Sequence, residues 1–174
     1  ERQVQLKGPD AARLAQTLCT RDLTKCVEGQ GKYVAICNHA GTLINDPIIL
    51  KRADDNYWLS IADSNILFWA RAIAAERGLN VEITEPDVSP LAVQGPKAED
   101  VVASIWFRET QINGIPVAVA RSGWSKQGGF EIYLMDGTRG AELWNLVKEA
   151  GKPFDIGPGN PNSHERIESG LLSY

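Results

Sequence analysis

The chain has 174 residues, of which 43% are apolar and 23% charged, and its formal net charge is -4. This length suits one domain or two small lobes, and the composition is that of a globular protein. Because Lys and Arg form no basic cluster and no apolar run approaches the roughly 18 residues of a bilayer span, we expect neither nucleic acid nor a membrane as a partner.

The cysteines and histidines exclude several kinds of site. Cys19, Cys26 and Cys37 show no Cys-x-x-Cys spacing, so we expect neither a disulfide framework nor a thiolate zinc site. Two histidines are too few for a multi-histidine metal site. A reducing cytoplasm is the expected location. The sequence shows neither an initiator Met nor a signal peptide, so we expect it to be the interior of a longer protein.

A short internal repeat divides the chain. Residues 5–11 and 92–98 each contain a strand end, a Gly-Pro pair and a helix start. In both copies the proline stands where a helix tolerates a missing N–H group. Two similar lobes are therefore expected, over residues 1–88 and 89–174.

The first lobe is predicted to mix antiparallel strands with two helices. Apolar residues at helical spacing and alternating apolar runs carry this prediction. Asp63 or Ser64 can cap the second helix, and Gly78 supplies its C-terminal stop. The predicted elements are a strand at 4–6, a helix at 11–19, strands at 33–37, 43–51 and 57–61, a helix at 66–77 and a strand at 80–84.

The second lobe is predicted to repeat this plan, with Asn113-Gly114 as a tight hairpin turn. Antiparallel hairpins closed by helices favour the α+β class over a parallel α/β sheet. At residues 105–106 a helix passes into a strand with no connecting residues, which suggests that a segment is missing there. The predicted elements are a strand ending at 94, a helix at 98–105, strands at 107–112, 115–121 and 130–135, and a helix at 139–150.

The glycine-rich turn at 121–133 is a candidate ligand platform. Its three glycines remove side-chain bulk where a flat molecule could lie against the backbone. Trp124 and Tyr133 offer aromatic faces, and Glu131 offers acceptor oxygens for the N–H groups of a heterocycle. The alternative interpretation is a hairpin with an aromatic pair.

Asp46 is a candidate catalytic residue at the start of a strand. Pro47 forces the residue before it into an extended conformation. If Asp46 faces a cleft, it can attract a cationic substrate or orient a reacting nitrogen. If it faces outward, it is an ordinary turn acid.

Four motifs follow one another along the chain. They are the Gly-Pro-x-Ala helix start, Gly41-x-x-x-Asn45-Asp46-Pro47, the turn from Arg121 to Glu131, and Arg166-x-Glu168-x-Gly170-Leu171. In this order they resemble the folate-binding region of the glycine-cleavage T-protein (aminomethyltransferase) superfamily. Within that superfamily, the turn and the chain ending are more similar to the branch that demethylates dimethylsulfoniopropionate than to the aminomethyltransferases.

The resemblance implies a tetrahydrofolate-dependent methyltransferase that takes a small-molecule methyl donor. It also implies a pterin channel between two lobes and a further C-terminal barrel domain outside the sequence shown, and it leaves a homodimer open. Glu131 matches the pterin-binding glutamate of the family. The other residues that the resemblance assigns to cofactor binding are Trp106, Phe107, Trp124, Ser125, Lys126 and Tyr133.

The resemblance departs from the aminomethyltransferases at the acid pair, because Asn45 replaces the first of two aspartates and only Asp46 remains. A sulfonium donor releases a neutral thioether and needs no strong general acid, whereas an amine leaving group needs proton transfer. We therefore expect a sulfonium donor. The alternatives are aminomethyl-lipoyl protein, dimethylglycine or an aryl methyl ether as donor, a folate-binding protein without methyl transfer, and a structural module.

Overall fold

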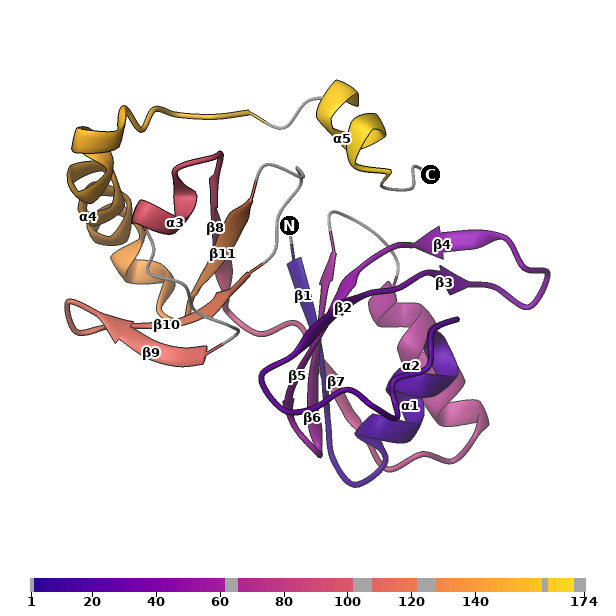
Figure 1. The fold of residues 1–174 in the computed structure, drawn as a ribbon. Helices are drawn as coiled ribbons and strands as arrows, with labels where there is room; N and C mark the ends of the chain where they lie inside the picture. Colours follow the sequence, from indigo (N-terminus) through magenta and orange to yellow (C-terminus); the bar gives the residue numbers. More distant parts are fainter. Residues whose placement is uncertain (1, 62–65, 102–107, 122–127, 161–162, 171–174) are drawn as a thin grey trace. The chain divides into compact units, whose positions relative to one another are not determined.

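The structure is a computed structural model that describes residues 2–61, 66–101, 108–121, 128–160 and 163–170 (Figure 1). The chain divides into two compact units, the first reaching Pro86 and the second beginning at Asp87. Each unit has its own hydrophobic core. The predicted α+β class of antiparallel strands and helices is confirmed.

The first unit is a five-stranded antiparallel sheet in the order β2-β5-β6-β1-β7, with two helices and a separate β3-β4 hairpin. Its elements are β1 (Arg2–Lys7), α1 (Ala11–Leu18), β2 (Gly31–Tyr33), β3 (Ile36–Cys37), β4 (Leu43–Asn45), β5 (Ile48–Ala53), β6 (Asn56–Ile61), α2 (Ile66–Glu76) and β7 (Glu82–Thr84).

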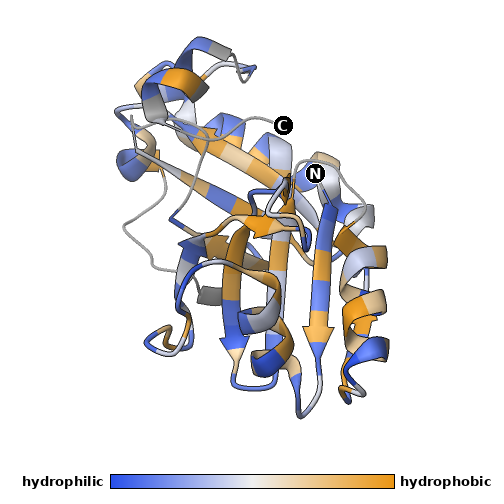
Figure 2. Cartoon of the chain, turned by 90° about the vertical axis from the view of Figure 1, so that its right-hand side faces the viewer, coloured by the Kyte–Doolittle hydropathy of each residue, from blue (hydrophilic) through white to orange (hydrophobic). Residues whose placement is uncertain are grey.

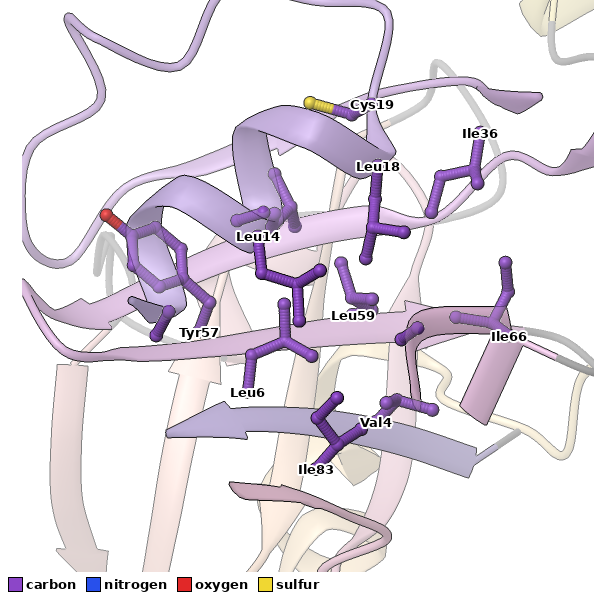
Figure 3. Close-up of a cluster of buried hydrophobic side chains, with 14 of the residues drawn as sticks. Val4, Leu6, Leu14, Leu18, Cys19, Ile36, Tyr57, Leu59, Ile66 and Ile83 are labelled. Carbon is purple, nitrogen blue, oxygen red and sulfur yellow. The ribbon is translucent and has the colours of Figure 1, made fainter. Parts of the chain in front are cut away.

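One face of this sheet carries the core. Successive strand residues point to opposite faces, so Val4 and Leu6 of β1 lie on the same side as Leu59 of β6. Figure 3 shows these side chains packed with Leu14 and Ile66 from α1 and α2. The opposite face, which we call the second face, carries Gln3, Gln5, Ile48, Leu50, Trp58 and Ser60.

The second unit is a four-stranded antiparallel sheet in the order β8-β11-β10-β9. Phe130, Ile132 and Leu134 of β11 point into its core beside Val117 and Val119 of β10. Its elements are β8 (Ser89–Gln94), α3 (Ala98–Val101), β9 (Arg108–Ile112), β10 (Ile115–Ala120), β11 (Gly129–Leu134), η1 (Gly137–Arg139), α4 (Gly140–Gly151), η2 (Lys152–Phe154) and α5 (Ser163–Ser169).

The Gly-Pro repeat has the same backbone geometry in both units. Gly8 and Gly95 both have positive φ, 138° and 121°, at the point where a strand turns into a helix. In each copy the glycine carbonyl accepts a 3.0 Å hydrogen bond, from the N–H of Ala11 or of Ala98. A Cβ at Gly8 would lie 2.8 Å from the carbonyl oxygen of Asn80, so that position requires glycine.

Two strand predictions were wrong in one respect, because each predicted strand is divided in the structure. Residues 33–37 form parts of β2 and β3, and residues 43–51 form β4 and most of β5. The second break falls at Asp46-Pro47, where proline has no N–H group for the ladder. Helix α5 was not predicted. The suspected missing segment at 105–106 lies outside the described residues.

Hydrophobic and hydrophilic bands alternate along the strands, as a sheet with one core face requires (Figure 2). Across the described part of the chain, no helix combines the length and the apolar character that crossing a membrane demands.

Candidate functional site

Glu131 and Tyr133 lie two residues apart on β11 and point away from the core of the second unit. The residues opposite Glu131 on the neighbouring strands are Ala92 and Ala120. Those opposite Tyr133 are Pro90 and Ala118. Directly opposite residues share a face, so the carboxylate has small side chains as its neighbours on both adjacent strands.

A hydrogen bond joins the two side chains. The Tyr133 hydroxyl donates to Glu131 Oε2 at 2.8 Å. Both residues are buried, with 9% of Glu131 and none of Tyr133 exposed. A carboxylate can accept about four hydrogen bonds, and the bond from Tyr133 holds one of its two oxygens in place. The Tyr133 hydroxyl therefore orients the Glu131 carboxylate, and the predicted part of Tyr133 in cofactor binding stays a prediction.

The described end of the glycine-rich turn is held close to the end of strand β8. The N–H of Gly95 donates to the carbonyl of Gly128 at 3.2 Å, and Gly128 has a φ of 84°. The positive φ therefore favours glycine at position 128, and a Cβ at Gly129 would require the Gln94 side chain to move. The predicted site residues Trp106, Phe107, Trp124, Ser125 and Lys126 lie outside the described residues.

Asp46 lies in the first unit, between β4 and β5. The Tyr33 hydroxyl donates to Asp46 Oδ2 at 2.7 Å, and both side chains are half-buried. Tyr33 was missed by the sequence analysis, although it stands directly opposite Ile48, two residues after the acid. The neighbouring Asn45 is only 1% exposed. Of this pair of side chains, Asp46 is the one with solvent access.

A cross-strand row of residues continues from Tyr33 over the second face. Ile48 faces Tyr33 on one side and Ser60 on the other, and Ser60 faces Gln3. The Gln3 amide donates to Ser60 Oγ at 3.3 Å. The sheet register therefore brings four residues from distant parts of the sequence into one line beside Asp46.

The adjacent row contains an aromatic residue with a cation over it. Leu50, Trp58 and Gln5 face one another across β5, β6 and β1. The indole N–H of Trp58 donates to Gln5 Oε1 at 3.0 Å. The guanidinium carbon of Arg52 lies 3.9 Å from the centroid of the Trp58 ring, which is a cation–π contact.

Two of the cysteines are unsuited to nucleophilic chemistry. Burial raises the pKa of the Cys19 thiol and of the Cys26 thiol, so both stay protonated at neutral pH.

Lys51 lies near Cys26 and forms a 2.7 Å ion pair with Asp54, which holds the pKa of that exposed carboxyl below its usual value. Across the described ranges, no three His, Cys, Asp or Glu side chains are grouped so as to hold a metal ion.

Comparison with known sequences gives a match along the whole chain. Residues 1–174 match the family model described as the GCVT N-terminal domain. The chain is 46% identical over 185 residues to dimethylsulfoniopropionate demethylase from Ruegeria pomeroyi, covering 100% of this chain and 51% of the relative. It is 31% identical over 186 residues to an aminomethyltransferase from Caldanaerobacter subterraneus, covering 97% of this chain and 50% of the relative. The chain thus spans about half the length of these curated relatives.

Two solved structures share the fold. The glycine cleavage system aminomethyltransferase T from Bartonella henselae aligns with a TM-score of 0.76 at 20% identity, over 99% of this chain and 49% of that chain. The heterotetrameric sarcosine oxidase from Corynebacterium sp. U-96 aligns with a TM-score of 0.61 at 16% identity, over 91% of this chain and 83% of that chain. At these identities the likeness concerns the fold.

Proposed function

The chain belongs to the family of GCVT N-terminal domains, and from that premise we propose that the protein is a tetrahydrofolate-dependent methyltransferase. The donor in this proposal is dimethylsulfoniopropionate, and the products are methylmercaptopropionate and 5-methyltetrahydrofolate. The observation that carries the proposal is the similarity to dimethylsulfoniopropionate demethylase, which extends over the whole chain and exceeds the similarity to the aminomethyltransferase from Caldanaerobacter subterraneus.

Glu131 is the residue that we expect to hold the pterin ring. Its buried carboxylate is oriented by Tyr133 and flanked by Ala92 and Ala120, which suits a flat heterocycle with N–H donors at its edge. Tetrahydrofolate, when bound, supplies the nitrogen that accepts the methyl group. Glu131 contributes binding and orientation, because its place on a central strand keeps it fixed.

A sulfonium donor fits the pair Asn45 and Asp46. When the bond between the methyl carbon and sulfur breaks, its electron pair stays on sulfur, so the leaving thioether is neutral and needs no general acid. The positive charge lost from sulfur is balanced by one proton released to solvent. We expect Asp46, which accepts a hydrogen bond from the Tyr33 hydroxyl, to attract the cationic donor.

The test is to incubate the full-length protein with dimethylsulfoniopropionate and tetrahydrofolate and to measure both products by mass spectrometry. We expect the thioether and 5-methyltetrahydrofolate in equal amounts, and neither product when folate is omitted. Absence of the thioether from the complete reaction would refute the proposal.

The similarity to aminomethyltransferases makes a second candidate, in which the folate is kept and the donor differs. Competition among dimethylsulfoniopropionate, aminomethyl-lipoyl protein, dimethylglycine and an aryl methyl ether would identify the preferred donor. Folate binding together with failure of every donor would instead indicate a non-catalytic folate-binding protein.

A further inference from the structure

Tyr33, which donates a hydrogen bond to Asp46, stands at the end of an edge strand. Among the described strands, β2 has three residues and pairs with β5 alone. The other side of an edge strand presents backbone groups that no neighbouring strand can satisfy. The Tyr33 hydroxyl lies 2.7 Å from Asp46 Oδ2, so the orientation of the acid depends on how this strand end is fixed.

The segment that follows α1 covers this outer edge. Arg21 Nη1 donates to the carbonyl oxygen of Tyr33 at 3.1 Å. The N–H and the hydroxyl of Thr20 both donate to the carbonyl oxygen of Ala35, at 3.0 and 3.2 Å. A hydrogen bond from a charged donor is roughly twice as strong as one between neutral groups, so we expect Arg21 to contribute most of the three.

The inner side of the same segment is joined to the backbone beside Asp46. The N–H of Val34 donates to the carbonyl oxygen of Pro47 at 3.0 Å. Val34 follows Tyr33 and Pro47 follows Asp46, so backbone and side chains connect the same two positions. O–H···O hydrogen bonds span only about 2.5–3.0 Å, so a small displacement of the end of β2 would loosen its hold on the acid.

Arg21 is itself anchored to helix α1. The Gln16 amide donates from Nε2 to the carbonyl oxygen of Arg21 at 3.0 Å, and its Oε1 accepts from the N–H of Leu23 at 2.7 Å. The Cys19 thiol also donates to the Arg21 carbonyl, at 3.2 Å. Because α1 packs into the core of the first unit, a series of hydrogen bonds runs from a fixed helix to the proposed donor site.

We propose that Arg21 is a positioning residue for the methyl donor and acts through Tyr33 on Asp46. The inference rests on the proposed function, in which Asp46 attracts the cationic donor. The positive charge of Arg21 would repel a sulfonium, so its role is to fix the strand end and not to bind the donor's cation. Its contribution to donor binding therefore depends on the hydroxyl of Tyr33.

The experiment is a double-mutant cycle in the full-length protein, with the Kd of dimethylsulfoniopropionate measured by calorimetry in the absence of folate. Arg21→Met keeps the apolar stem and removes the donor group, so it should raise this Kd about 2- to 10-fold, the worth of one hydrogen bond. In a Tyr33→Phe background the same substitution should change the Kd by less than about twofold, because the connection to Asp46 is already cut. Arg13→Met, at an exposed position on α1, is the matched control.

Two further measurements separate positioning from other roles. A purely structural contribution of Arg21 lowers the melting temperature equally in both backgrounds and cannot make its effect on the donor depend on Tyr33. Arg21→Lys keeps a charged donor and should lose less affinity than Arg21→Met. Arg21→Met should also weaken a trialkylsulfonium without a carboxylate by the same factor as the donor.

An equal rise in donor Kd in the wild-type and Tyr33→Phe backgrounds would overturn the inference, as would an unchanged Kd in folded Arg21→Met. A loss confined to the donor with a carboxylate would overturn it as well, because Arg21 would then contact the donor directly. In each of these cases demethylation by the wild-type protein leaves the proposed function standing. A wild-type protein that neither binds nor demethylates the donor would refute both.

Discussion

Replacing Glu131 by Ala tests the pterin site most directly. The carboxylate lies beside Ala92 and Ala120 on a central strand, and the Tyr133 hydroxyl orients it at 2.8 Å. A hydrogen bond to a charged group contributes about 1.5–3 kcal/mol, and a pterin edge can offer two N–H donors to one carboxylate. A loss of about 3 kcal/mol corresponds to a rise of roughly 100-fold in the Kd of tetrahydrofolate.

The substitution also affects stability, and this effect can be separated from binding. In Glu131→Ala the buried Tyr133 hydroxyl loses its 2.8 Å bond to Glu131 Oε2, which costs about 1–3 kcal/mol. The double variant Glu131→Ala, Tyr133→Phe removes that hydroxyl as well and should recover melting temperature without recovering folate affinity. Tyr133→Phe alone should weaken folate binding less than Glu131→Ala, because the carboxylate remains.

The assay is calorimetric titration of the full-length protein with tetrahydrofolate, alongside thermal melting and donor titration. Glu76→Ala, at an exposed position on α2, is the matched control. We expect the Kd of folate to rise in Glu131→Ala while the Kd of the donor stays within about twofold. A folate Kd within twofold of the wild-type value in a folded Glu131→Ala protein would refute the assignment of the pterin to this carboxylate.

Three further outcomes follow from the geometry of the first unit and the repeat. Tyr33→Phe removes the 2.7 Å bond to the acid and should raise the donor KM several-fold while the folate Kd is unchanged; an equal rise in both would contradict a positioning role. Pairing with Lys51 lowers the pKa of Asp54. The stabilising effect of this ion pair should therefore be present above about pH 4 and be lost as the pH falls through the lowered pKa. The melting temperatures of Asp54→Asn and of the wild-type protein should converge in acid. Gly8→Ala should lower the melting temperature more than Gly95→Ala, because both glycines have positive φ but only Gly8 has a backbone atom 2.8 Å from the added Cβ; equal losses would refute that difference.

The local features of this chain could be read from the sequence. Alternation of apolar residues placed Glu131 and Tyr133 on one face of a strand, because side chains two residues apart in an extended chain point the same way. The Gly-Pro pairs predicted two strand-to-helix turns, since only glycine adopts the required positive φ without strain. These properties depend on a few neighbouring residues, so the sequence by itself determined them.

The contacts that complete the candidate site depend on strand order and register. Tyr33 reaches Asp46 because β2 pairs with β5, and Gln3 reaches Ser60 across 57 positions of sequence because β1 pairs with β6. Alternation predicts the face on which a side chain lies, but it does not predict which strand becomes its neighbour. Hydrogen bonding between strands and burial of the core select one order and one register from many, and that selection belongs to the tertiary structure.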